Sequence, residues 1–87
     1  MGKPQTETKT ESFTPNAVEQ KFQRDGEGVE RDAAMLATLG IMEPTEVRKN
    51  IEDAGYMAAE EMGIDKGHAK TIIDGILAQF DRDLAAA

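Results

Sequence analysis

The spacing of apolar residues in the last third of the chain is the strongest constraint on its fold. Six large apolar side chains recur there at short steps of one, three or four residues: Ile72, Ile73, Ile76, Leu77, Phe80 and Leu84. Such steps place side chains on one face of an α-helix, whereas a half-buried strand needs strict alternation. The sequence shows no such alternation, and its β-branched residues are sparse. We therefore expect an all-α fold.

The first helical stretch of the sequence contains signals for a start and for an interruption. Thr14 is a residue type that caps helices, and Pro15 after it suits the first helical position. Gly26 and Gly28 lie two residues apart, and closely spaced glycines usually break or kink a helix. These signals predict a first helix from Pro15 and a second helix over about residues 27–39.

Two matching stop signals divide the rest of the chain. The triplets Leu39-Gly40-Ile41 and Met62-Gly63-Ile64 each place a glycine between apolar residues. Glycine suits the left-handed conformation that ends many helices, and the apolar residue after it usually folds back on the last turn. We therefore expect a third helix over about residues 44–62 and a fourth from the cap Asp65 to about Leu84.

The chain divides into a tail and one helical domain. Residues 1–12 are polar and lack apolar periodicity, which is typical of a disordered N-terminal tail. Residues 13–87 form the predicted compact domain of three to four helices, arranged as helical hairpins. A domain of this size buries only about 60% of its unfolded surface. Because the apolar stripe of residues 72–84 is wider than one short neighbour can cover, we expect part of it to contact another chain.

The charge of the chain is strongly acidic and restricts its direct ligands. The formal net charge is −7, and acids are densest in the third predicted helix. An acidic surface repels phosphate backbones, so direct nucleic-acid binding is disfavoured. Five acids of this helix define a candidate acidic face: Glu46, Glu52, Asp53, Glu60 and Glu61. Such a face either keeps the protein soluble or imitates the phosphates of a nucleic acid.

The residues that carry most enzyme chemistry are scarce. There is no cysteine, which excludes disulfides and thiolate metal sites and fits a reducing cytoplasm. The single histidine, His68, has no partner set of the kind that metal or acid–base sites need. Glycine-rich phosphate loops and apolar runs of about 20 residues are also absent. The sequence predicts no enzyme activity, no cofactor, no metal and no membrane span.

Two side chains of the third helix lack an obvious neighbour in their own chain. Tyr56 and Met57 fall on the face opposite Ala54 and Ala58. A partner-facing patch is a reasonable interpretation of such an exposed pair. Together with the stripe of the fourth helix, the predicted partner-binding residues are Tyr56, Met57, Ile72, Ile73, Ile76, Leu77 and Phe80.

Residues 62–80 resemble part of a known family. The positions that carry the resemblance are Gly63, Ile64, Lys66, Ala69, Lys70, Ile73, Asp74, Ile76 and Leu77. They are similar to the N-terminal helical hairpin of the bacterial histone-like nucleoid proteins, the HU and IHF family. The resemblance covers less than a quarter of the chain and includes neither the β-sheet body nor the basic DNA-binding arms. It implies an intertwined dimerisation hairpin and no DNA-binding residues.

These observations favour a protein–protein interaction module. We expect it to act as a homo-oligomer or as a small structural subunit of a larger assembly. Two alternatives remain open at this point. One is an acidic inhibitor that imitates nucleic acid and occupies a DNA- or RNA-binding protein, and the other is a non-catalytic accessory subunit of a multi-chain enzyme.

Overall fold

Three α-helices make up the part of the protein that the structure describes. The computed structural model describes residues 14–87, with helices α2 (Ala17–Thr38), α3 (Pro44–Glu61) and α4 (Lys66–Ala86) and no strand among them. The predicted all-α fold is therefore confirmed for these residues. The predicted tail, residues 1–12, lies outside the described residues.

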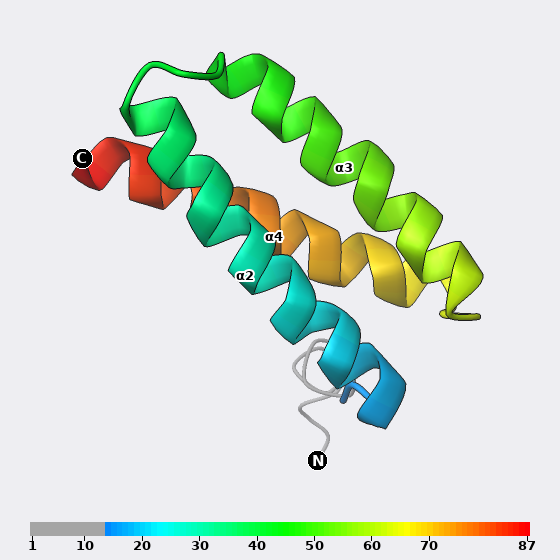
Figure 1. The fold of residues 1–87 in the computed structure, drawn as a ribbon. Coiled ribbons are helices and arrows are strands. Elements are labelled where there is room, and N and C mark those ends of the chain that lie inside the picture. Colours follow the sequence, from blue (N-terminus) through cyan, green and yellow to red (C-terminus); the bar gives the residue numbers. More distant parts are fainter. Residues whose placement is uncertain (1–13) are drawn as a thin grey trace.

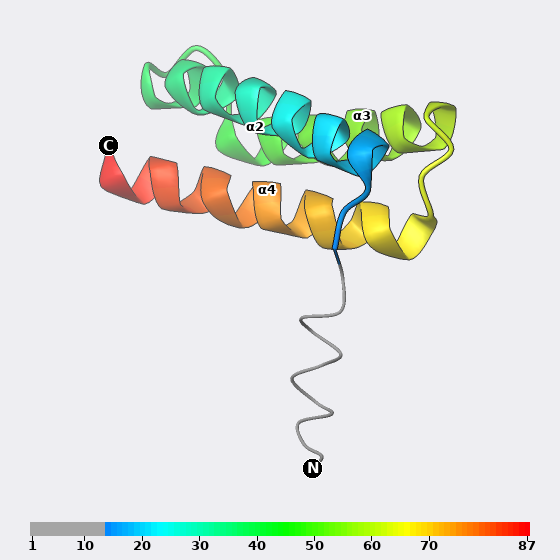
Figure 2. The same cartoon turned by 90° about the horizontal axis from the view of Figure 1, so that it is seen from below.

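The helices form two layers. The helices α2 and α3 lie side by side in one layer, and α4 lies across them in the other (Figures 1 and 2). Since each connection is short, every helix runs back along the one before it. One face of the α2/α3 layer therefore rests on α4, and its other face is turned away from α4.

Helix α2 is continuous, so the predicted break at Gly26 and Gly28 is wrong. Both glycines lie inside the helix. A Cβ on Gly26 would overlap the Cδ1 atom of Ile76, so this glycine leaves room for that side chain of α4. No atom lies within 4 Å of a Cβ built on Gly28. The tertiary packing of the helix as a whole thus outweighs the cost of about 1 kcal/mol that each glycine adds to a helix interior.

The start of α2 also differs from the prediction. The N-cap is Asn16, rather than Thr14 followed by Pro15. Its Oδ1 accepts a hydrogen bond from the Glu19 backbone N–H at 2.8 Å, and Glu19 Oε1 accepts one from the Asn16 N–H at 2.9 Å. This reciprocal capping box pairs two backbone donors that a helix start leaves without partners. It therefore stabilises a start at Asn16 more than the predicted Thr14 cap would stabilise an earlier one.

Both predicted glycine stops are confirmed. Gly40 and Gly63 have φ values of 77° and 72°, which few residues with a side chain adopt. After each glycine, the next backbone N–H reaches back five residues: Ile41 to Leu36 O and Ile64 to Ala59 O, both at 2.9 Å. A left-handed glycine followed by this backbone hydrogen bond is the helix ending known as the Schellman motif. The two stops fix the lengths of α2 and α3 and hence the two turns.

Helix α4 supplies most of the core. Its stripe residues Ile72, Ile73, Ile76, Leu77 and Phe80 are all buried, with Phe80 fully enclosed. The helices α2 and α3 cover the two sides of this stripe from within the same chain, through residues such as Phe22 and Ile51. The expectation that the stripe is too wide for one domain is therefore wrong. It counted one neighbouring helix where the fold provides two.

Candidate interaction groove

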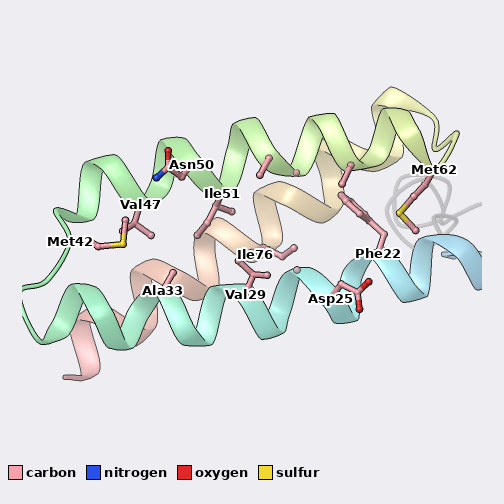
Figure 3. Close-up of a pocket in the computed structure, with 14 residues that line it drawn as sticks. Phe22, Asp25, Val29, Ala33, Met42, Val47, Asn50, Ile51, Met62 and Ile76 are labelled. Carbon is pink, nitrogen blue, oxygen red and sulfur yellow. The ribbon is translucent and has the colours of Figure 1, made fainter.

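A groove opens between α2 and α3 on the face turned away from α4. It encloses about 360 Å³. Figure 3 shows α2 and α3 as its walls, with Ile76 of α4 reaching its floor. The residues that line it are Phe22, Asp25, Gly26, Val29, Ala33, Met42, Val47, Asn50, Ile51, Ala54, Gly55, Ala58, Met62 and Ile76.

Small side chains keep the groove open. Its walls contain Ala33 of α2 and Ala54, Gly55 and Ala58 of α3, none of which reaches across the space. Longer side chains, Met42 and Met62, lie towards its two ends (Figure 3). The result is a concave apolar surface of the kind that binds ligands and partner side chains.

The groove keeps its polar groups at the edges. Asp25 of α2 and Asn50 of α3 are its two polar side chains, and they lie at opposite edges (Figure 3). Val29, on the α2 wall, keeps 59% of its surface exposed. An aliphatic side chain this exposed beside an apolar hollow has a surface that a partner could cover.

Further exposed apolar side chains occur near the end of α2. Met35, Leu39 and Ile41 are each at least 60% exposed. Ile41 follows the glycine stop, and its exposure leaves its side chain free of the core. Single exposed apolar residues are common on protein surfaces, but three within seven positions extend the apolar surface at this end of the layer.

The predicted partner-binding residues do not form one surface. The five from α4 are buried in the core, and of these Ile76 alone lines the groove. Tyr56 is half-buried and packs on the core, whereas Met57 is 63% exposed. These two line a separate hollow of about 790 Å³ near the α3–α4 turn, beside Glu60, Lys66 and Lys70. Only Met57 therefore remains a freely exposed apolar residue of that predicted set.

The residues of the predicted acidic face are exposed. This holds for all five: Glu46, Glu52, Asp53, Glu60 and Glu61. Within this helix, Lys49 Nζ lies 3.3 Å from Asp53 Oδ2, so one acid of the face is paired with a cation. Exposed pairs of this kind contribute well under 1 kcal/mol each to stability.

A buried acid, Glu30, was not anticipated from the sequence. Glu30 of α2 is 1% exposed, and its Oε2 atom has no hydrogen-bond partner. Burial, together with the neighbouring Asp83 carboxyl of α4, raises the pKa of Glu30 to about 7, while the hydrogen bond with Glu30 lowers the pKa of Asp83. One proton is thus shared across the α2–α4 contact at slightly acid pH. The sequence contains one indication that Glu30 faces the core. Glu30 lies four residues from both Gly26 and the buried Ala34, which places all three on one face of the helix.

A second cross-helix contact joins the starts of α2 and α4. Asp65 caps α4 as predicted, and its Oδ2 accepts a hydrogen bond from the His68 N–H at 3.1 Å. The ring of His68 places Nδ1 2.8 Å from Oε2 of Glu19, whose other oxygen serves the capping box. The hydrogen bond to Glu19 raises the pKa of His68. His68 thus has a structural partner, which the sequence analysis missed because the two residues lie far apart in the chain.

Metal and membrane sites do not emerge within residues 14–87. No group of three or more histidine or carboxylate side chains in that range is arranged to hold a metal ion. Within the same residues, no helix combines the length and apolarity needed to cross a membrane.

Comparisons with known proteins do not add an identification. Searches against family models, curated proteins and solved structures gave no significant match. The resemblance of residues 62–80 to the histone-like hairpin stays a prediction.

Proposed function

We propose that this protein is a small interaction module that binds an α-helix of another protein in the groove between α2 and α3. The observation that carries the proposal is the groove itself, an apolar hollow of about 360 Å³ with polar groups only at its edges. Amphipathic helices commonly bind by laying their apolar side chains into such a hollow.

The layered arrangement supports a helix as the bound element. The side chains of a helix form ridges that fit the grooves on the surface of a neighbouring helix, so a third helix can pack against both α2 and α3. The α2/α3 layer already uses one of its two faces to hold α4 (Figure 2). A helix placed in the groove would complete a four-helix arrangement of the kind that bundles adopt.

The proposal moves the contact surface away from α4. The sequence-based argument for self-association relied on an uncovered stripe on that helix, and Ile73 and Phe80 of the stripe are no more than 1% exposed. The groove also suits the accessory-subunit alternative, because the bound helix could belong to an enzyme. The acidic-inhibitor alternative would instead use the exposed acids of α3, so it predicts a different binding surface.

A model peptide tests the proposal. The probe is a helix-forming peptide with a leucine stripe and uncharged glutamine flanks, titrated into the ¹⁵N-labelled protein. We expect the amide signals of Val29, Ala33, Ala54 and Ala58 to shift, because these residues line the groove. Shifts confined to the outer side of α3, or none at all, would contradict the proposal.

A matched pair of variants controls the experiment. Ala54 is exposed and lines the groove, so Ala54→Gln should obstruct it without unfolding the protein. Ala78 is exposed on α4 and does not line the groove, so Ala78→Gln makes the same chemical change elsewhere. We expect Ala54→Gln to weaken peptide binding at least about tenfold, as losing about 1.4 kcal/mol of contact would do, and Ala78→Gln to leave it unchanged. Equal effects of the two changes would count against binding in the groove.

A further inference from the structure

We infer that the helix received by this groove carries lysine or arginine on both flanks of its apolar stripe. The inference rests on the proposed function and specifies the chemistry of the partner. It follows from the charges on the two walls, from the length of the groove and from the charge of this chain itself.

Exposed acids border the groove on both sides. Asp25 lines the α2 edge, and Asp32 lies seven residues further along α2, which keeps it within about 20° of the same side of the helix. On α3, Glu61 lies seven residues after the groove-lining Ala54, and Glu43, the N-cap residue of α3, directly follows the groove-lining Met42. Asp25, Asp32, Glu43 and Glu61 are all exposed, and we refer to them as the acidic rim.

Few cations offset this rim. Lys21 pairs with Asp25, with Nζ and Oδ2 2.8 Å apart. Three arginines lie away from the rim: Arg48 pairs with Asp81 of α4, and Arg31 and Arg82 line the depression beside Glu30 and Asp83. The rim is therefore acidic on both walls. A helix lying between two acidic edges gains most when both of its flanks are basic.

The length of the groove sets the length of the bound segment. Its lining runs from Phe22 to Ala33 along α2 and from Val47 to Met62 along α3. At 1.5 Å per residue these stretches are roughly 17 Å and 22 Å long. The occupant is thus a helix of about three to four turns with basic flanks.

A second copy of this chain is a poor occupant for the same reason. Two copies that meet by the same surface, as in a symmetric dimer, would bring the acidic rims together. The chain as a whole has a net charge of −7, so its approach to another copy is repelled as well. A basic partner segment removes both penalties.

Three peptides with one leucine stripe test the inference. Their flanks are lysine, glutamine or glutamate, and binding is measured by the amide shifts of Ala33 and Ala54 at low ionic strength. We expect the lysine peptide to bind about tenfold more tightly than the glutamine peptide and the glutamate peptide to bind most weakly. Raising the salt concentration to about 0.3 M should close most of the gap, since charges on the surface are then screened.

Two double variants separate the rim from the general charge of the protein. Asp25→Asn with Asp32→Asn neutralises the α2 part of the rim. Asp53→Asn with Glu60→Gln neutralises two exposed acids of the outer face of α3. Each pair changes the net charge from −7 to −7 + 2 = −5. Asp25 and Asp53 each also have a lysine partner four residues earlier in the chain, so the two double variants are well matched.

The outcomes distinguish the inference from the proposed function. We expect the rim variant to weaken the lysine peptide three- to tenfold and the outer-face variant to weaken it less than about twofold. Equal losses would show attraction by overall charge and would overturn the inference. Equal binding of the lysine and glutamine peptides would overturn it while leaving helix binding intact. Failure of all three peptides to shift groove signals would remove the proposed function itself. A dimer in sedimentation that Ala54→Gln dissociates would assign the groove to a second copy instead.

Discussion

The buried carboxyl of Glu30 should make the protein less stable as the pH rises towards neutral. Glu30 is 1% exposed, and its pKa is raised from an ordinary value of 4.5 to about 7. The folded state therefore holds a proton between these two pH values that the unfolded chain has released. Stability from such a group is complete below pH 4.5 and is lost as the pH rises through about 7.

The size of the effect follows from the two pKa values. Between about pH 5.5 and pH 8, the free energy of unfolding should fall by on the order of 2 kcal/mol. The lowered pKa of Asp83 acts only at more acid pH, because its stabilisation is lost as the pH falls below the ordinary value of 3.8. The substitution Glu30→Gln keeps the shape of the side chain without the titration, so most of this slope should disappear.

Urea denaturation followed by circular dichroism measures the slope directly. The unfolding free energy is obtained at several pH values for the wild-type protein, for Glu30→Gln and for Glu60→Gln, an exposed control. We expect Glu30→Gln to match or exceed wild-type stability at pH 8 and the control to keep the wild-type slope. A wild-type protein that becomes more stable from pH 5.5 to pH 8, or a Glu30→Gln variant with an unchanged slope, would refute the reasoning.

Two further predictions concern contacts that join the helices. Gly28→Ala should raise the unfolding free energy by about 0.5–1 kcal/mol because the new methyl group meets no atom. Gly26→Ala should lose that gain because its Cβ would displace the side chain of Ile76. The melting temperatures of the two variants should therefore differ, and equal melting temperatures would show that α2 does not rely on a glycine beside Ile76. His68→Gln should cost more stability near pH 5.5 than near pH 8. The pKa of His68 is raised in the folded state, so its contribution to the free energy of unfolding is present below about pH 6.5 and is lost above the folded pKa. If urea denaturation showed the same loss at both pH values, an ionic contact with Glu19 would be contradicted.

The parts of the fold that depend on neighbouring residues were predictable from the sequence. The glycine stops at Gly40 and Gly63 and the cap at Asp65 each act within one helical turn, so the residue types alone indicate them. The apolar stripe of α4 was also identified correctly as one face of a helix, but part of it was expected to contact another chain and is instead buried within this one. The periodicity of the stripe is set by residues close together in the chain, whereas the number of helices that cover it depends on the whole fold.

The predictions that were wrong, and the features that were not predicted, involve contacts between residues far apart in the chain. Gly26 looks like a helix breaker until Ile76, fifty residues later, is seen against it. Merging the first two predicted helices into α2 also creates the groove wall, so a groove could not be expected while a break was assumed there. Glu30 has the register of a core residue, but its partner Asp83 comes from the other end of the domain.

The most direct test of helix binding in the groove is the position of a bound helix on the protein surface. A leucine-stripe peptide with glutamine flanks, labelled at its centre with a nitroxide, broadens the signals of the protein amides nearest to it. The account predicts the strongest broadening at Val29, Ala33, Ala54 and Ala58, which line the groove, and the weakest at Asp74 and Ala78, which are exposed on α4. Strongest broadening at Asp74 and Ala78, or broadening that Ala54→Gln leaves unchanged, would contradict it.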